Sequence, residues 1–61
     1  HKIRIRHATA LLSEGLLSVD AISAQCGFDD VGYFRRIFKR ASGMTPSDYR
    51  RIYARVHINT A

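Results

Sequence analysis

Residues 18–41 read SVDAISAQCGFDDVGYFRRIFKRA, and this stretch decides the fold. Apolar residues recur in it at steps of three and four, first over a short segment and then over a longer one, which is the pattern of a helix with one buried stripe. Gly27 separates the two segments. The stretch therefore predicts a short helix, a tight turn and a longer helix.

The short helix begins after Ser18, whose hydroxyl can accept a hydrogen bond from a free backbone N–H at the helix start. Asp20 in the first turn favours the positive end of the helix dipole. A helix that ends at Gly27 has only about two turns and is not stable alone, so it must pack on its neighbours. Its expected buried stripe consists of Val19, Ile22 and Cys26.

The longer helix is expected over residues 30–41, with Asp29 as its N-cap. Phe28 and Tyr33 then stand on either side of the cap, as in a hydrophobic staple. Its expected inward face consists of Phe34, Ile37, Phe38 and Ala41. A different face carries Gly32, Arg35, Arg36 and Lys39.

Helices are also expected on both sides of this stretch. Before it, residues 2–12 have an apolar stripe and stop near Gly15, which can take the left-handed conformation after a helix end. After it, Thr45 is the expected N-cap, Pro46 the first helical residue and Asp48 the partner in a capping box. The expected apolar stripes are Ile5, Ala8 and Leu12 in the first helix, and Tyr49, Ile52, Tyr53 and Val56 in the last. The residues after His57 give no clear signal.

The charge is strongly positive and uneven. Ten Lys and Arg oppose five Asp and Glu, for a net charge of +5, and the isoelectric point is near 10.2. From Tyr33 to Arg55 there are seven basic residues and one acid. Such a balance is typical of nucleic-acid binding, although solvated helix faces alone also account for it.

A short helix, a tight turn and a longer helix with a basic outer face describe the helix-turn-helix unit, whose second helix enters the major groove of DNA. Residues 18–41 fit this unit. The sequence therefore predicts an all-α protein: a small helical bundle with a homeodomain-like helix-turn-helix, preceded by a linker helix.

The same residues resemble the C-terminal signature of the AraC/XylS family of bacterial transcription regulators. The resemblance rests on a Gly-Phe turn, an aromatic pair, a Phe-Lys-basic step and a Gly-x-Thr-Pro-x-x-Tyr-Arg ending, and it covers roughly residues 4–51. The matching segments are Ala21-Ile22-Ser23, Cys26-Gly27-Phe28, Tyr33-Phe34, Phe38-Lys39-Arg40, Gly43-Met44-Thr45-Pro46-Ser47 and Tyr49-Arg50. Two departures are Val31 and Gly32, where polar residues are common, and Ser23, where alanine is usual.

The resemblance implies an organisation in which residues 1–13 are a linker helix after a first motif that is absent, and residues 17–57 are the second motif with its supporting helix. The chain opens on His1, which fits a subdomain of a longer protein with effector and dimerisation domains elsewhere. We expect a soluble protein of the bacterial cytoplasm, at the nucleoid, because no stretch approaches the roughly 18 apolar residues of a membrane span.

The resemblance also implies the site. Base contacts are expected from Val31, Gly32, Arg35 and Arg36 on the longer helix, and phosphate contacts from Lys39 and Arg40. Arg36 is the first choice for gripping a guanine. Thr45 and Ser47, at the start of the last helix, offer a positive dipole end to a phosphate, although a capping role also explains Thr45.

The sequence gives little support for a redox, metal-binding or catalytic function. Cys26 is expected to be a buried apolar residue rather than a redox sensor, and His1, His7 and His57 lack metal-ligand spacing, so neither a metal nor a cofactor is expected. Ser18 and Ser47 are explained as residues of helix starts, which leaves no catalytic residue and no enzyme. The aromatic residues fall on inward or staple positions and are expected in the core rather than on a base-stacking surface.

The expected partner is double-stranded DNA, with RNA polymerase as a second one. The alternative from another class is a protein-interaction module whose basic face meets an acidic partner such as RNA polymerase, without reading DNA. The two hypotheses differ in sequence specificity.

Overall fold

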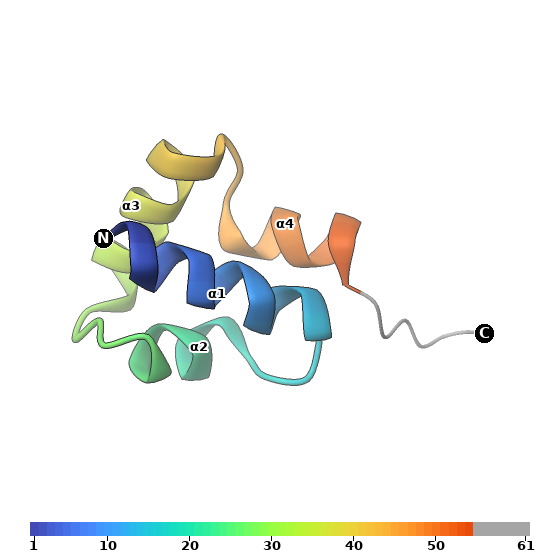
Figure 1. Cartoon of the computed structure of the whole chain (residues 1–61), viewed down its shortest axis with the longest axis horizontal. Coiled ribbons are helices and arrows are strands. Elements are labelled where there is room, and N and C mark those ends of the chain that lie inside the picture. Colours follow the sequence, from blue (N-terminus) through green and yellow to red (C-terminus); the bar gives the residue numbers. More distant parts are fainter. Residues whose placement is uncertain (55–61) are drawn as a thin grey trace.

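The structure is a computed structural model and describes residues 1–54. It contains the helices α1 (Lys2–Glu14), α2 (Val19–Gln25), α3 (Val31–Ser42) and α4 (Pro46–Tyr53). The described part of the chain has no strand, so the predicted all-α fold is confirmed. Figure 1 shows α1 lying between α2 and the two later helices, with α3 at the end of the bundle where α1 begins.

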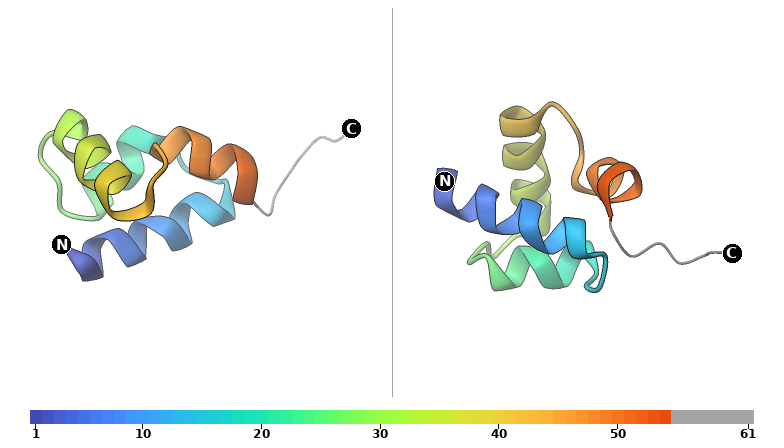
Figure 2. Two further views of the ribbon diagram at one scale, coloured as in Figure 1. Left: turned by 90° about the horizontal axis from the view of Figure 1, so that it is seen from above. Right: turned by 45° about the vertical axis from the view of Figure 1, so that its right-hand side comes forward.

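The helices cross rather than line up in one direction. The right-hand view of Figure 2 shows α3 standing upright across α1 and α2, which run side by side. α4 packs back on α1, and α3 contacts both α2 and α4. The outer side of α3 is thereby left uncovered at one end of the molecule.

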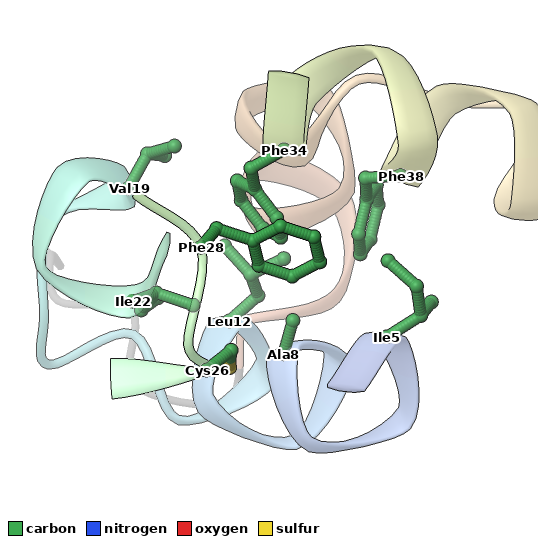
Figure 3. Packing of buried hydrophobic residues seen from close by; sticks show 9 residues of the cluster. All are labelled: Ile5, Ala8, Leu12, Val19, Ile22, Cys26, Phe28, Phe34 and Phe38. Carbon is green, nitrogen blue, oxygen red and sulfur yellow. The ribbon is translucent and has the colours of Figure 1, made fainter. Parts of the chain in front are cut away.

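The core is built mainly by α1, α2, α3 and the turn between α2 and α3, and α4 adds the buried Pro46. Phe34 and Phe38 are fully buried, and with Phe28 they face Ile5, Ala8 and Leu12 of α1 (Figure 3). The ring centroids of Phe28 and Phe34 lie 5.1 Å apart and those of Phe34 and Phe38 5.8 Å apart. The other buried apolar residues are Ile5, Ala8, Leu12, Val19, Ile22 and Cys26. The first helix is therefore an integral part of the bundle.

Most helix ends follow the predicted capping chemistry. The Ser18 hydroxyl accepts a hydrogen bond from the Ala21 N–H at 3.1 Å, and the Thr45 hydroxyl accepts one from the Asp48 N–H at 3.1 Å. Pro46 is the first residue of α4, as expected. Gly15 has a left-handed φ of 73°, but α1 continues to Glu14, two residues beyond its expected end.

The expected start of α3 is wrong by one residue. Asp30, not Asp29, is the N-cap: its backbone is extended, and its carboxylate accepts a hydrogen bond from the Gly32 N–H at 3.0 Å. The two neighbouring aspartates are chemically equivalent caps, so local sequence did not distinguish them. Phe28 and Tyr33 still contact each other, with ring centroids 6.1 Å apart.

The expected apolar stripe of α4 is also largely wrong. Tyr49 is half-buried against Phe38, but Ile52 and Tyr53 are 57% and 50% exposed. These two residues lie on the last turn of α4, where the rest of the described chain does not cover them. Val56 and His57 lie outside the described residues. Ala41, expected on the inward face of α3, is exposed.

The described residues give three observations on redox chemistry, metal binding and membrane insertion. Cys26 is buried, and burial raises the pKa of its thiol, which keeps it in the unreactive neutral form. Within residues 1–54, no group of three or more His, Cys, Asp and Glu side chains is placed to hold a metal ion. None of the helices in this range has both the length and the apolar character needed to cross a membrane.

Candidate nucleic-acid interface

The outer side of α3 carries a row of cations. Arg35, Arg36, Lys39 and Arg40 are all exposed, whereas Phe34 and Phe38 on the opposite side of the same helix are fully buried. We call these four side chains the cationic face of α3. Because the aromatic side of the helix is anchored in the core, the cationic face is held in a fixed orientation toward solvent.

Arg35 has an acidic neighbour on α2. Its Nη2 lies 3.8 Å from the Asp20 carboxylate, and the two side chains are 53% and 77% exposed. An ion pair of this length in solvent contributes little free energy. Arg35 can therefore exchange Asp20 for another anion at small cost.

Arg36 lies against an aromatic ring. Its Cζ atom is 5.8 Å from the centroid of the Tyr33 ring, one turn earlier on α3. A Cβ atom built at Gly32 would lie 4.0 Å from Arg36 Nη1 and 3.4 Å from Asp30 Oδ1, so a methyl group there would make ordinary contacts with both side chains. This first turn of α3 combines a positioned cation with an uncovered stretch of backbone.

Val31 differs in burial from the other predicted base-contacting residues. Its side chain is half-buried and packs against the hydrophobic core. Only part of it remains available to a ligand, whereas Gly32, Arg35 and Arg36 keep their outward sides free. The apolar character of position 31, unusual for the family it resembles, thus has a packing explanation.

A shallow hollow of about 590 Å³ lies beside the cationic face, between α3 and the loop to α4. It brings together predicted base-contacting and phosphate-contacting residues, and its lining consists of Arg35, Arg36, Lys39, Arg40 and Thr45. Ser47 is exposed on the first turn of α4 but does not line it. Lys39 and Arg40 also lie in the last turn of α3, where positive charge stabilises the helix dipole.

Three residues gain roles that the sequence did not predict. Arg50 donates a hydrogen bond to the Leu17 carbonyl. Arg4 on α1 contacts the turn between α2 and α3, and Tyr33 is 39% exposed beside Arg36 rather than a core residue. For Arg4, one signal was present: it lies one helical turn before Ala8 and two before Leu12, on the inward side of α1.

Comparison with known proteins agrees with this geometry. A family model described as "Helix-turn-helix domain" matches residues 1–52. The chain is 49% identical over 51 residues to the "HTH-type transcriptional activator RhaR" of Salmonella heidelberg (strain SL476), which covers 84% of the chain and 18% of that relative. The protein of the same name from Salmonella arizonae is 47% identical with the same coverage.

The chain spans less than a fifth of the length of these curated relatives. The search of solved structures gives no significant match. The matched family region, residues 1–52, includes the segments from Ala21 to Arg50 that carry the sequence resemblance. The chain therefore belongs to the AraC-type helix-turn-helix family.

Proposed function

We propose that α3 inserts into the major groove of double-stranded DNA and presents its first half to the bases and its second half to the phosphates. The observation that carries this proposal is the cationic face, which is exposed along the helix while the opposite side is anchored by Phe34 and Phe38. An α-helix fits the width of the major groove. α1 and α2 then hold its angle of entry.

Base reading is assigned to Arg36 first, with Arg35, Gly32 and Val31 beside it. An arginine can donate two hydrogen bonds to the O6 and N7 atoms of guanine, which is worth about 1–3 kcal/mol of discrimination. Gly32 permits close approach of the backbone to the base edges, and the exposed part of Val31 suits a thymine methyl group. Arg35 approaches the DNA by leaving Asp20.

Phosphate binding is assigned to Lys39 and Arg40, with Thr45 and Ser47 at the start of α4. The Thr45 hydroxyl already accepts a hydrogen bond from the Asp48 N–H, and Pro46 has no N–H to donate. The Ser47 N–H and hydroxyl are then the donors that the first turn of α4 offers to a phosphate, in addition to its positive dipole end.

The wider organisation is part of the same proposal. Residues 1–13 would link this domain to a preceding motif, and residues 17–57 would form the second motif with its supporting helix. Effector and dimerisation domains, a contact with RNA polymerase and a place at the nucleoid in the bacterial cytoplasm belong to the longer protein, of which the chain would be a part without catalytic activity. The fraction of the relatives that is matched supports this view.

Selection from a randomised DNA duplex pool, repeated at low and moderate salt, tests the proposal. We expect binding that weakens steeply with salt, on the order of micromolar or weaker for a lone motif, together with an enriched half-site. Salt-sensitive binding without enrichment would contradict base reading. Absence of binding at low salt would favour the alternative, in which the basic face meets an acidic protein surface.

A further inference from the structure

Arg4 on α1 contacts the turn that leads into α3. Its Nη1 donates a hydrogen bond to the Gly27 carbonyl at 3.3 Å, and its Cζ lies 5.6 Å from the centroid of the Phe28 ring. The guanidinium therefore engages two successive residues of the turn. Arg4 itself is exposed, whereas Phe28 is buried.

The turn is shaped to receive this side chain. Gly27 has a φ of 89°, which side-chain-bearing residues rarely adopt, and a Cβ atom built there would lie 3.4 Å from Arg4 Cζ. α2 has no basic residue in its last turn, and Arg4 supplies a positive charge at the carbonyl end of that helix from outside it. The turn is thus held by α1 as well as by its own helices.

A continuous series of ring and cation contacts connects Arg4 to Arg36. Phe28 contacts Tyr33 with ring centroids 6.1 Å apart, and Arg36 lies over Tyr33 at 5.8 Å. The same four side chains line a second hollow of about 330 Å³, together with Gly27, Asp29 and Asp30. Both cation-to-ring distances are within about 6 Å, the range of a cation–π attraction.

We propose that Arg4 is a positioning residue for Arg36: it fixes Phe28 and, through Tyr33, the ring against which the base-reading guanidinium lies. This inference rests on the proposed base-reading role of Arg36. A long exposed side chain loses rotamer freedom when it binds, and a ring held in place restricts that freedom beforehand. Arg4 then contributes to base preference without touching DNA.

The experiment compares variants of the 61-residue chain on the selected half-site and on duplexes that change its bases one at a time. Arg36→Ala identifies the base pair that this arginine reads. Arg4→Ala is the test, Arg6→Ala removes the same charge from an exposed position of the same helix, and Tyr33→Leu interrupts the series at a second point. Circular dichroism and thermal unfolding verify that each variant is folded.

We expect Arg4→Ala and Tyr33→Leu to lower the preference at the Arg36 base pair about fivefold, the lower end of what a bidentate arginine confers. Arg6→Ala should leave that preference unchanged. The double variant Arg4→Ala/Arg36→Ala should be no less selective than Arg36→Ala alone, because Arg4 acts through Arg36.

Other results would overturn the inference. If Arg4→Ala weakens binding to all sequences equally and reduces the salt slope by about one unit, Arg4 is a direct phosphate contact. Additive losses in the double variant would mean that Arg4 acts independently of Arg36. If the unchanged chain shows no base preference, the proposed function is refuted. If the unchanged chain prefers certain bases and Arg4→Ala keeps that preference, only the role of Arg4 is refuted.

Discussion

Arg50 on α4 donates a hydrogen bond from its guanidinium to the main-chain carbonyl of Leu17, in the loop between α1 and α2. The contact is partly buried and joins residues 33 positions apart. α4 packs on α1 and buries Pro46, and this bond and the packing of Tyr49 on Phe38 attach it further to the bundle. Arg50 thereby has a structural role at the contact between α4 and the loop from α1 to α2.

The first prediction follows from this bond. Arg50→Ala should lower the free energy of unfolding by about 1.5 kcal/mol, since a hydrogen bond from a charged donor is lost and a carbonyl is left unpaired. Arg51→Ala is the matched control, because the interaction that Arg51 makes within residues 1–54 is an exposed pair with Asp48, worth less than about 0.5 kcal/mol. Urea unfolding measures both, and equal effects would contradict the structural role of Arg50.

The second prediction concerns Ser23, a buried hydroxyl on α2. The residue is 2% exposed, and its Oγ has no hydrogen-bond partner among the described residues. Ser23→Ala should therefore raise the free energy of unfolding by about 1 kcal/mol, because the cost of a buried unpaired polar group disappears. The resemblance to a family with alanine at this position agrees with that expectation.

Ser18→Ala provides the opposite control for Ser23→Ala on the same helix. The Ser18 hydroxyl caps α2, so its removal should cost about 1 kcal/mol. Thermal and urea unfolding of both variants distinguish the two kinds of serine. A loss of stability in Ser23→Ala would show that its hydroxyl has a partner in solution.

The third prediction separates stability from binding at Gly32. Its φ is not in the left-handed region, and an added Cβ would meet Asp30 Oδ1 at 3.4 Å, an ordinary contact. Gly32→Ala should stabilise the domain by about 0.5 kcal/mol through helix propensity, yet weaken DNA binding, because the methyl group obstructs the approach of α3 to the base edges.

Gly43→Ala is the control for Gly32→Ala. Gly43 has a φ of 83° with open space around the missing Cβ, so alanine there should cost about 1 kcal/mol of stability from backbone strain and leave binding by folded protein unchanged. Unfolding curves and fluorescence anisotropy with a labelled duplex measure the two properties. Undiminished binding by Gly32→Ala would refute close approach at this position.

Local chemistry determined how much the sequence could predict. Ser18, Thr45 and Pro46 act within a single helical turn, so their roles at helix starts could be predicted from neighbouring residues. The predicted start of α3 was wrong by one residue because Asp29 and Asp30 are equally suitable N-cap residues. The roles of Arg4 and Arg50 depend on partners 23 and 33 residues away. Helical periodicity places Arg4 on the inward side of α1, but it does not identify these partners.

The error in α4 has a different cause. Helical spacing correctly placed Tyr49 with Ile52 and Tyr53 as apolar residues of one helix, but it does not tell whether a neighbour covers them. Tyr49 meets Phe38, whereas the last turn extends past the bundle and leaves the other two exposed. For the site, periodicity placed the cationic face correctly, while the hollow beside it required the loop to α4 to be folded.

The fourth prediction tests the division of labour along α3. Arg36→Ala and Lys39→Ala each remove one positive charge from the cationic face, so each serves as the control for the other. Arg36→Ala should reduce the preference at one base pair by about 1–3 kcal/mol. Lys39→Ala should instead weaken binding to every sequence about equally and reduce the salt slope by about one unit.

The reason for this contrast is geometric. Arg36 lies over Tyr33 near the start of α3, beside the side-chain-free Gly32, where the proposed docking brings base edges within reach, whereas Lys39 lies in the last turn of the helix. A lysine is a point charge that suits a phosphate, and an arginine is a planar fork that suits guanine. Competition binding against single-base variants, repeated across salt concentrations, separates the two effects. If both variants lose affinity equally on all sequences, α3 holds the backbone alone and base reading must come from elsewhere in the longer protein.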